Sequence, residues 1–375
     1  MNNNEKPQKG KRILLSIVSV LLAIILFVMA GATILADTIL SKVNYVEKGQ
    51  DATVSYEEAL ALKDQETTEA SISDFYEEPE DLEGLEGLVE EESTEPVTYE
   101  TLNEEELVLE VEITEPVGEE ETITNILLIG QDSLKGKRER SDTMILITVN
   151  QEKNTITLTS FMRDMYVKIP GYYNEKINSA YMLGGMDLLN ETLYQNFGIV
   201  VDHNVEVSFG QFRQIIDYLG GITLKIDAKE AAFINYANGI KSIQAGEVHL
   251  DGNCALAYAR YRDKAAGDFA RTERQRKTIN ALIQQYKNAN LSTMIGITNE
   301  LMGMITTNMT KSEILNYAVE FFPMLATAEI ISQRVPFDGK HTNGNDYYYM
   351  AKRNDVSVVV PRLPEIVAKL SETLS

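Results

Sequence analysis

The chain has 375 residues, of which 44% are apolar and 24% are charged, a composition typical of a globular protein with a hydrophobic core. Its formal net charge of −23 excludes a nucleic-acid-binding protein that relies on bulk positive charge. One cysteine and three scattered histidines argue against a disulfide framework and against zinc or iron–sulfur sites, so any bound metal is expected to have oxygen ligands.

The first 36 residues have the pattern of a membrane anchor. Residues 13–36 contain no charged side chain, and an α-helix of this length spans about 36 Å, enough to cross a hydrocarbon core of about 30 Å. A cleaved signal peptide is the alternative, but its apolar region usually has only about 7–15 residues. Basic residues are concentrated in residues 1–12, which predicts a cytoplasmic tip, a transmembrane signal-anchor helix and an extracytoplasmic remainder. The expected location is the cell membrane, crossed once.

The next segment, residues 37–121, is strongly acidic. Residues 43–121 carry 28 acidic side chains and only two basic ones. Such a segment buries too little apolar surface to offset the entropy lost on ordering, which predicts a disordered acidic extracytoplasmic linker. A short helix around residues 56–63 and a strand around residues 107–113 are expected as local exceptions. Calcium binding and a docking role are the alternatives to a plain spacer.

The last segment, residues 122–375, has 27 acidic and 27 basic side chains and a globular pattern. Short apolar runs alternate with segments of helical periodicity. The expected strands are residues 125–130, 143–149, 155–160, 206–209, 222–226, 330–335 and 357–360, and the expected helices are residues 180–197, 209–219, 252–260, 268–287, 293–305, 311–325 and 364–374. Strands interleaved with helices predict an α/β fold, in which helices cover both faces of a central sheet.

Two aspartates flank the first two expected strands. Asp132 follows the first strand, and Asp142 directly precedes the second. Ligands of α/β sheets bind in the loops at strand ends, and Mg²⁺ is often held by one or two carboxylates together with substrate phosphates. The pair therefore predicts a Mg²⁺ site, with Mn²⁺ as an alternative metal. Ordinary turns or helix caps are the competing interpretation.

Arginines from four separate segments accompany these carboxylates: Arg140, Arg163, Arg260, Arg262 and Arg271. Gln275 follows Arg271 by four residues and should lie on the same helix face. Guanidinium groups bind phosphate oxygens bidentately and stay charged, so the set predicts a polyanionic phosphate ligand. The alternative is a solvated basic helix face paired with neighbouring acids such as Asp263, Asp268 and Glu273. The sequence contains neither a GxxxxGK[ST] phosphate loop nor a Gly-x-Ser-x-Gly nucleophile motif.

Seven motifs occur in a characteristic order: Asn125-Ile-Leu-Leu-Ile-Gly-Gln-Asp132, Arg140-Ser-Asp-Thr143, Ser160-Phe-Met-Arg-Asp164, Lys176-Ile-Asn-Ser-Ala-Tyr181, Leu250-Asp-Gly252, Ala257-Tyr-Ala-Arg-Tyr-Arg262 and Gly267-Asp-Phe-Ala-Arg271. Together they resemble the LytR–CpsA–Psr family over about residues 124–290. Met162 stands where that family usually has proline, and Ala270 where it usually has glycine, so the path of the Arg163 loop is in question.

The resemblance implies an α/β/α sandwich with a central mixed sheet, and an apolar tunnel for a prenyl chain with arginines at its mouth. It also implies a membrane-anchored, Mg²⁺-dependent phosphotransferase of a Gram-positive type of cell envelope. Such an enzyme moves a glycopolymer, such as teichoic acid or capsule, from a polyprenyl-pyrophosphate carrier onto peptidoglycan as a phosphodiester. The alternatives are a non-catalytic lipid-pyrophosphate binder that regulates envelope assembly, and a pyrophosphatase that releases the polymer.

The resemblance also assigns roles to individual residues. Asp132 and Asp142 match the family's Mg²⁺-associated aspartates, and the pyrophosphate-contacting positions match Arg140, Arg163, Arg260, Arg262, Arg271 and Gln275, with Asp268 beside them. The expected catalytic set is Asp132, Asp142, Arg163 and Asp164. Either Asp132 or Asp164 could accept the proton of the acceptor hydroxyl.

Overall fold

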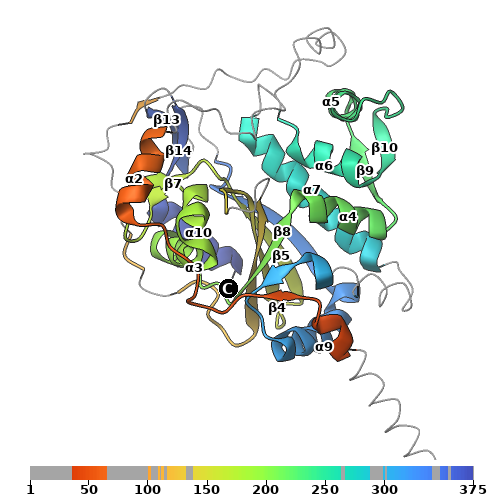
Figure 1. The fold of residues 1–375 in the computed structure, drawn as a ribbon, viewed down its shortest axis with the longest axis horizontal. Helices are drawn as coiled ribbons and strands as arrows, with labels where there is room; N and C mark the ends of the chain where they lie inside the picture. The colour runs from red at the N-terminus through yellow and green to blue at the C-terminus, as the bar shows by residue number, and fades with distance from the viewer. Residues whose placement is uncertain are drawn as a thin grey trace, which may run out of the picture.

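The computed structural model describes residues 36–65, 100–102, 109, 111–113, 116–131, 138–262, 267–287, 299, 302–339, 347–353 and 356–374. A seven-stranded mixed sheet lies at the centre (Figure 1), in the order β1-β11-β8-β3-β4-β5-β12. Its strands are β1 (Asn44–Tyr45), β11 (Thr306–Thr307), β8 (His203–Ser208), β3 (Ile123–Gln131), β4 (Ser141–Asn150), β5 (Thr155–Phe161) and β12 (Glu329–Val335). The neighbours of β4 are antiparallel to it, whereas β3 pairs with β8, and β5 with β12, in parallel.

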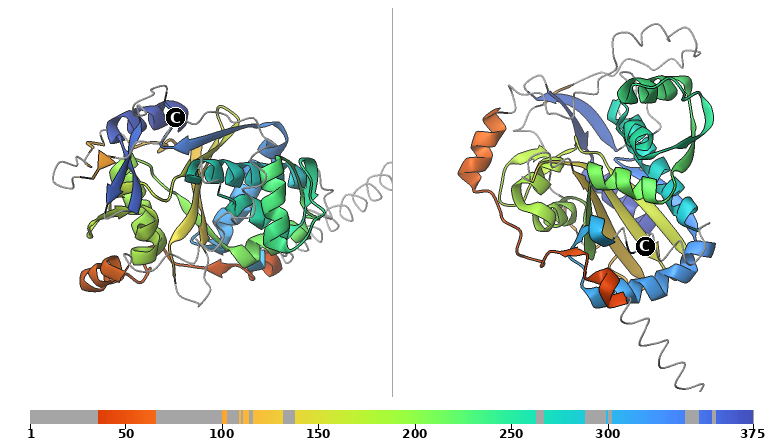
Figure 2. Two further views of the ribbon diagram at one scale, coloured as in Figure 1. Left: turned by 90° about the horizontal axis from the view of Figure 1, so that it is seen from above. Right: turned by 45° about the vertical axis from the view of Figure 1, so that its right-hand side comes forward.

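Helices cover both faces of this sheet, as the view from above in Figure 2 shows. On one face, Leu127 and Ile129 of β3 join a core that contains α3 (Asn178–Phe197) and α10 (Leu363–Leu374). On the other face, Leu128 packs in a cluster with Ile279 of α7 (Gly267–Lys287). A strand that is buried on both faces needs a continuous apolar run, which is what residues 126–129 provide.

A smaller lobe stands outside the sheet and carries its own core. The antiparallel pair β9 (Ile222–Ile226) and β10 (Gly246–Leu250) packs on α4 (Phe209–Tyr218), α5 (Ala228–Asn238) and α6 (Gly252–Arg260). Side chains of β9 alternate between buried and exposed, because only one of its faces meets the helices. Residues 222–226 are thus a strand as expected, but they belong to this lobe and not to the central sheet.

The remaining elements lie around the sheet. A three-stranded sheet contains β14 (Val356–Pro361), β13 (Tyr348–Arg353) and β2 (Glu100–Thr101), and a short hairpin joins β6 (Tyr166–Lys168) to β7 (Asn174–Lys176). Also described are α2 (Tyr56–Gln65), the short η3 (Met302–Met304) and α9 (Lys311–Thr327). The expected strand at residues 357–360 is therefore confirmed as β14, although it too lies outside the central sheet.

The sequence predictions of an α/β fold and a mixed central sheet are confirmed. Six of the expected helices and all seven strands have described counterparts, most of them with ends within two or three residues. The helix expected at residues 293–305 falls mostly outside the described residues. The sequence prediction missed the helix α5 and the strands β1, β2, β6, β7, β10, β11 and β13. The helix α3 is interrupted at Gly184 and Gly185, which have non-helical backbone angles.

The prediction of a disordered linker from residue 37 onward is wrong for residues 37–65. Strand β1 pairs with β11, the Val54 N–H donates to the Leu183 carbonyl over 2.8 Å, and Ala59 of α2 is fully buried in the main core. Val117 is also buried, and β2 pairs with β13. The number of acidic residues led to a wrong prediction of disorder, because a few apolar residues at the right spacing are enough to dock a short segment on an existing core.

Other parts of that prediction stay open. Residues 66–99 lie outside the described residues. The helix expected around residues 56–63 is confirmed as α2, whereas Leu109 and residues 111–113 are not in a strand. The expected membrane anchor, residues 13–36, lies outside the described part except for its last residue. None of the helices in the described part is long and apolar enough to cross a membrane.

Docking of α2 can be tested at two adjacent residues. Ala59→Asp places an unpaired charge in the core, so we expect it to cost about 2–3 kcal/mol, up to the free energy with which α2 docks. Leu60 is 38% exposed, and Leu60→Asp is the matched control, with an expected cost below about 1 kcal/mol. Thermal melting and limited proteolysis of α2 measure both. Equal effects of the two substitutions would show that α2 does not dock through Ala59.

Candidate functional site

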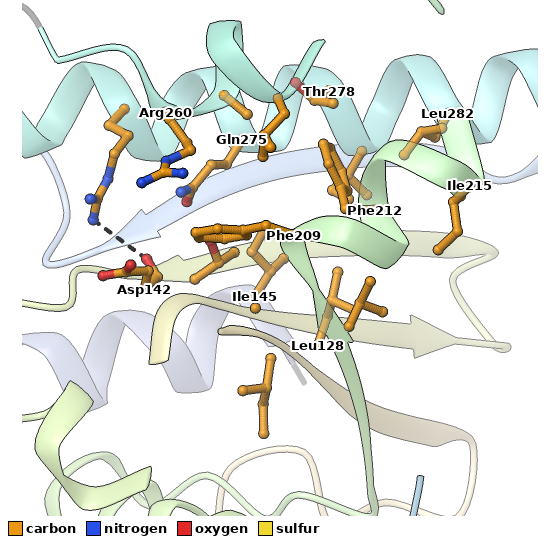
Figure 3. A pocket seen from close by; sticks show the side chains of 18 of the residues that line it. Leu128, Asp142, Ile145, Phe209, Phe212, Ile215, Arg260, Gln275, Thr278 and Leu282 are labelled. Atoms are coloured by element: carbon orange, nitrogen blue, oxygen red, sulfur yellow. Dashed lines mark hydrogen bonds between the residues drawn. The ribbon is translucent and has the colours of Figure 1, made fainter. Parts of the chain in front are cut away.

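An open cavity of about 950 Å³, its mouth included, lies between the central sheet and the helices α4, α6 and α7 (Figure 3). Strands β3 and β4 form one wall, and the helices form the other. Asp142, Arg260 and Gln275 gather at one end of the cavity, whereas Phe212 and Leu282 lie at the other (Figure 3). The site therefore combines a charged end with an apolar one.

The helix α7 contributes to both ends because of its periodicity. Arg271, Gln275, Thr278 and Leu282 are spaced by four, three and four residues, so they lie on one face of the helix, and all four line the cavity. Their order along the chain is cationic, polar, polar and apolar. The helix thus runs from the charged end of the cavity toward the apolar end.

Arg163 is the centre of the charged end. It follows β5, and its side chain is only 9% exposed. Its guanidinium forms an ion pair with Asp142, and its Nε lies 3.6 Å from an Asp164 carboxylate oxygen and 3.7 Å from Asp268 Oδ1. These three carboxylates outweigh the effect of burial and raise the pKa of Arg163. Arg163 is therefore a permanently charged, fixed group.

Asp268 connects this arginine to α7. Its Oδ1 lies 2.7 Å from Arg271 Nη2 and 3.8 Å from Arg262 Nη2. Burial raises the pKa of Asp268 and lowers the pKa of Arg271, while each of the two partially offsets the effect on the other. Arg271 also donates to the Asp142 carbonyl over 3.4 Å, the dashed line in Figure 3. One carboxylate thus holds three arginines from three segments together.

The shortest ion pair of Asp164 is with a lysine and not with an arginine. Its Oδ1 lies 2.7 Å from Lys176 Nζ, the residue that ends β7. Burial alone would raise its pKa, but Lys176 and Arg163 together lower the pKa of Asp164 to about 2. A carboxylate with so low a pKa is a weak proton acceptor, which argues against its predicted role as the general base.

The remaining site residues border the same region. Arg140 Nε donates to Ser179 Oγ over 3.3 Å, and burial lowers the pKa of Arg140 while Glu175 raises it. Arg260 lies over the Phe209 ring, 4.7 Å from its centre, and lines the cavity. The structure thus brings together every site residue predicted from sequence that it describes. Asp132 lies outside the described residues.

The alternative of a solvated basic helix face is not supported. The Arg271 side chain is only 5% exposed, and Arg163 is equally enclosed. Glu273, which that alternative would pair with these arginines, forms an ion pair with Lys277 at 2.7 Å. Arg274 on the same helix points away from the cavity and forms a buried ion pair with Glu230, 2.7 Å from Nε to Oε1.

Sequence reasoning missed two kinds of functional residue. Lys176 begins one of the seven motifs, but the sequence analysis assigned it no function, although it forms an ion pair with Asp164. Phe212 and Ile215 line the apolar end of the cavity, and Phe209 lines it beneath Arg260; the spacing of these three residues on α4 was the available signal. Met162 is buried, and Arg163, the next residue, forms an ion pair with Asp142. Arg163 therefore reaches the charged end with methionine at position 162.

The charged end offers limited coordination for a metal. The described residues contain no group of three or more histidine, cysteine, aspartate or glutamate side chains placed to hold a metal ion. The Asp142 carboxylate lines the cavity and is 16% exposed. This carboxylate suits a Mg²⁺ site in which one or two carboxylates bind the ion and substrate phosphates complete its coordination. It does not suit a site in which protein side chains supply every ligand.

Comparison with known proteins identifies the family. The model of the LytR_cpsA_psr family matches residues 88–361. The chain belongs to this family. A polyisoprenyl-teichoic acid–peptidoglycan teichoic acid transferase, TagU of Bacillus subtilis strain 168, is 32% identical over 248 residues, which cover 65% of this chain and 78% of the relative.

Solved structures of the family share the fold. The crystal structure of Bacillus subtilis TagT is 26% identical, covers 73% of this chain and 99% of its own, and superposes with a TM-score of 0.54. A second structure, the LytR-CPS2A-psr family protein YwtF (TagT), contains bound octaprenyl pyrophosphate lipid. It is 26% identical, covers 71% of this chain and 95% of its own, and gives a TM-score of 0.52.

The low pKa of Asp164 predicts a pH-dependent loss of stability in Asp164→Asn. Because the folded pKa is depressed, the ionised Asp164 stabilises the fold above its unfolded pKa, and this contribution is lost as the pH falls through about 2. At pH 7 we expect Asp164→Asn to cost on the order of 2 kcal/mol, and much less near pH 2.5. Urea melts at both pH values, with the exposed Glu247→Gln as control, measure this. An equal cost at both would show that packing, and not charge, is responsible.

Proposed function

We propose that this protein is a glycopolymer transferase that moves a polymer from a polyprenyl-pyrophosphate carrier onto peptidoglycan as a phosphodiester. One observation carries the proposal: a single cavity has three arginines at its charged end, Arg260, Arg262 and the buried Arg271, and apolar side chains of α4 and α7 at its other end. A lipid pyrophosphate has the matching shape, with an anionic headgroup on an apolar chain. The names of the relatives agree, since TagU is a teichoic acid transferase and the YwtF structure holds octaprenyl pyrophosphate.

The charge balance of the site supports an anionic ligand. Six cationic side chains surround the charged end: Arg140, Arg163, Lys176, Arg260, Arg262 and Arg271. The carboxylates of Asp142, Asp164 and Asp268 offset half of this charge, and Glu175 beside Arg140 is itself paired with a further arginine, Arg353, at 2.8 Å. The remaining positive charge would be matched by pyrophosphate oxygens, which guanidinium groups bind through short, charge-assisted hydrogen bonds.

In the proposed reaction, a hydroxyl oxygen of peptidoglycan attacks the phosphorus that bears the glycopolymer. The bond from that phosphorus to the bridging oxygen breaks, and prenyl monophosphate leaves with the electron pair while the hydroxyl proton passes to a base. Arginines fixed around the phosphates stabilise the charge that develops. Asp164 is a poor base for the proton because Lys176 and Arg163 hold its pKa at about 2.

A Mg²⁺ ion would be held by Asp142 with phosphate oxygens, and Asp132 is the expected second ligand. When bound, it would neutralise charge on the pyrophosphate. We further propose that residues 13–36 anchor the protein in the cell membrane with its N-terminus in the cytoplasm, so that the site faces the cell wall. Product analysis separates the alternatives: linked polymer indicates a transferase, no product a regulatory binder, and free phosphorylated polymer a pyrophosphatase.

The two ends of the cavity can be tested with two probes, octaprenyl pyrophosphate in detergent and inorganic pyrophosphate. Arg260→Ala and Arg262→Ala should each weaken binding of both probes by about 10- to 150-fold, because each removes charge-assisted hydrogen bonds worth about 1.5–3 kcal/mol. Phe212→Asp should weaken binding of the lipid alone. Arg→Lys should restore binding only in part, because an ammonium group lacks the planar fork.

The exposed Arg213→Ala, on α4 but outside the cavity lining, is the control and should bind both probes as the native protein does. Calorimetric titration and thermal melting are measured on the same samples. Unchanged affinity for both probes in Arg260→Ala/Arg262→Ala would leave the cavity without a headgroup site, and the transferase assignment would have to be abandoned.

The metal proposal gives a separate prediction. Chelation of divalent cations should abolish transfer, and Mg²⁺ should restore it in the native protein but only weakly in Asp142→Asn, which loses one ligand charge while keeping its shape. Transfer is measured from lipid-linked donor to a peptidoglycan fragment across a Mg²⁺ titration. Full activity of Asp142→Asn in the presence of chelator would exclude a metal role for this residue.

A further inference from the structure

A segment outside the family match reaches into the neighbourhood of the site. Residues 44–65, here called the N-terminal strap, precede the matched residues 88–361. In Figure 1 the strap, in orange-red, runs from β1 beside β11, past α3, to α2. It is held by the Val54–Leu183 backbone hydrogen bond and by the Tyr173 hydroxyl, which donates to the Ala59 carbonyl over 2.7 Å.

Asp51 links the strap to two other parts of the molecule, the helix α3 and Arg138. Its Oδ2 accepts hydrogen bonds from the backbone N–H groups of Met186 and Asp187 over 2.7 and 3.3 Å. These groups open the second half of α3, after the break at Gly184 and Gly185. A carboxylate at a helix N-terminus is stabilised by the unpaired N–H groups and the helix dipole. The strap thus caps a helix that the break leaves without a cap of its own.

The same carboxylate binds an arginine near the site. Asp51 Oδ1 lies 3.3 Å from Arg138 Nη1, and both side chains are largely enclosed. Arg138 also donates to the carbonyls of Met182 and Ala52. Gly185 makes room for the pair: its φ is +66°, and an added Cβ would lie 2.3 Å from Asp51 Oδ2 and 2.4 Å from Arg138 Nη1. The backbone of α3 is therefore shaped to carry this ion pair.

Arg138 stands two residues before Arg140, in the stretch that leads into β4. The Glu139 N–H between them donates to Gln131 Oε1 over 3.3 Å, and Arg140 Nε donates to Ser179 Oγ. Ser179 lies in the first half of α3, and Arg138 contacts Met182 one turn further along it. Two arginines from one short stretch thus hold the same helix, and Asp51 fixes one of them.

We propose that Asp51 is a positioning residue: through Arg138 it fixes the stretch that carries Arg140, and so sets the affinity of the site for pyrophosphate. The inference rests on the proposed function. Because coupling between two binding events is reciprocal, a pyrophosphate ligand must in turn stabilise the docked strap. A merely structural strap would lack this second effect.

The experiment uses the full chain in detergent with octaprenyl pyrophosphate as probe. We expect Asp51→Asn and Arg138→Gln each to weaken binding by about 5- to 20-fold, since small displacements of a phosphate contact have large effects. The double variant should bind no more weakly than about the worse single one, because both remove the same pair. Arg138→Lys keeps the charge and should restore part of the affinity.

Asp37→Asn is the control, since it removes an exposed ion pair, 3.0 Å in length, with Lys311, the first residue of α9. It should bind the probe as the native chain does. Hydrogen exchange provides the second readout: the probe should slow exchange of the Val54 amide in the native chain and in Asp37→Asn, but not in Asp51→Asn. Thermal melting confirms that all variants are folded at the assay temperature.

Two results would overturn the inference. The first is native affinity in Asp51→Asn or Arg138→Gln, and the second is probe-induced protection of Val54 that persists in Asp51→Asn. If Asp51→Asn fails to fold, the affinity of Arg138→Gln decides alone, and native affinity there overturns the inference. Failure of the native chain to bind the probe, with Arg260→Ala indistinguishable from it, would instead overturn the proposed function and the inference with it.

Discussion

The buried guanidinium of Arg163 is the constraint on which the charged end of the molecule depends. A charge that is only 9% exposed must be paired, because an isolated buried ion is strongly unfavourable. Its partners come from different elements: Asp142 from the start of β4, Asp164 from the loop after β5, and Asp268 from the start of α7. Pairing this one arginine therefore fixes the first turn of α7 against the ends of the interior strands β4 and β5. The cavity between them follows from that placement.

The carboxylates also prepare the site for its ligand. Before an anion binds, the buried arginines of its site repel one another, and they would separate without nearby negative charges. Asp268 holds Arg271 and Arg163 within ion-pair distance, so their guanidinium groups are already gathered before a phosphate arrives. Such preorganisation reduces the cost of binding and of stabilising developing charge. The excess of cations over acids then leaves the site attractive to an anion.

Much of this arrangement could be predicted from sequence because it is local. The spacing of Arg271 and Gln275 places both on one helix face, and the apolar run of β3 requires cover on both sides. Missed features depend on distant partners. Nothing near Arg274 in the sequence reveals that it turns to Glu230, and nothing near Asp164 reveals the lysine that makes it a poor base. The strand β9 was expected but not its pairing with β10 outside the central sheet, because a strand's own residues do not specify its neighbours.

The strap shows why the average charge of a segment is a poor predictor of whether that segment is ordered. Within it, acidic residues act as local structural groups: Ser55 and Glu58 form a reciprocal cap at the start of α2, and Asp51 caps α3. The Ser-x-x-Glu pattern is readable in the sequence, and the same kind of signal, Asp227 with Glu230, begins the helix α5, which the sequence prediction missed. An acidic residue that meets an orphan N–H group stabilises structure, whereas the same residue in a run of like charges opposes it. Position relative to a helix start, and not the count of charges, therefore decides whether such a segment can dock.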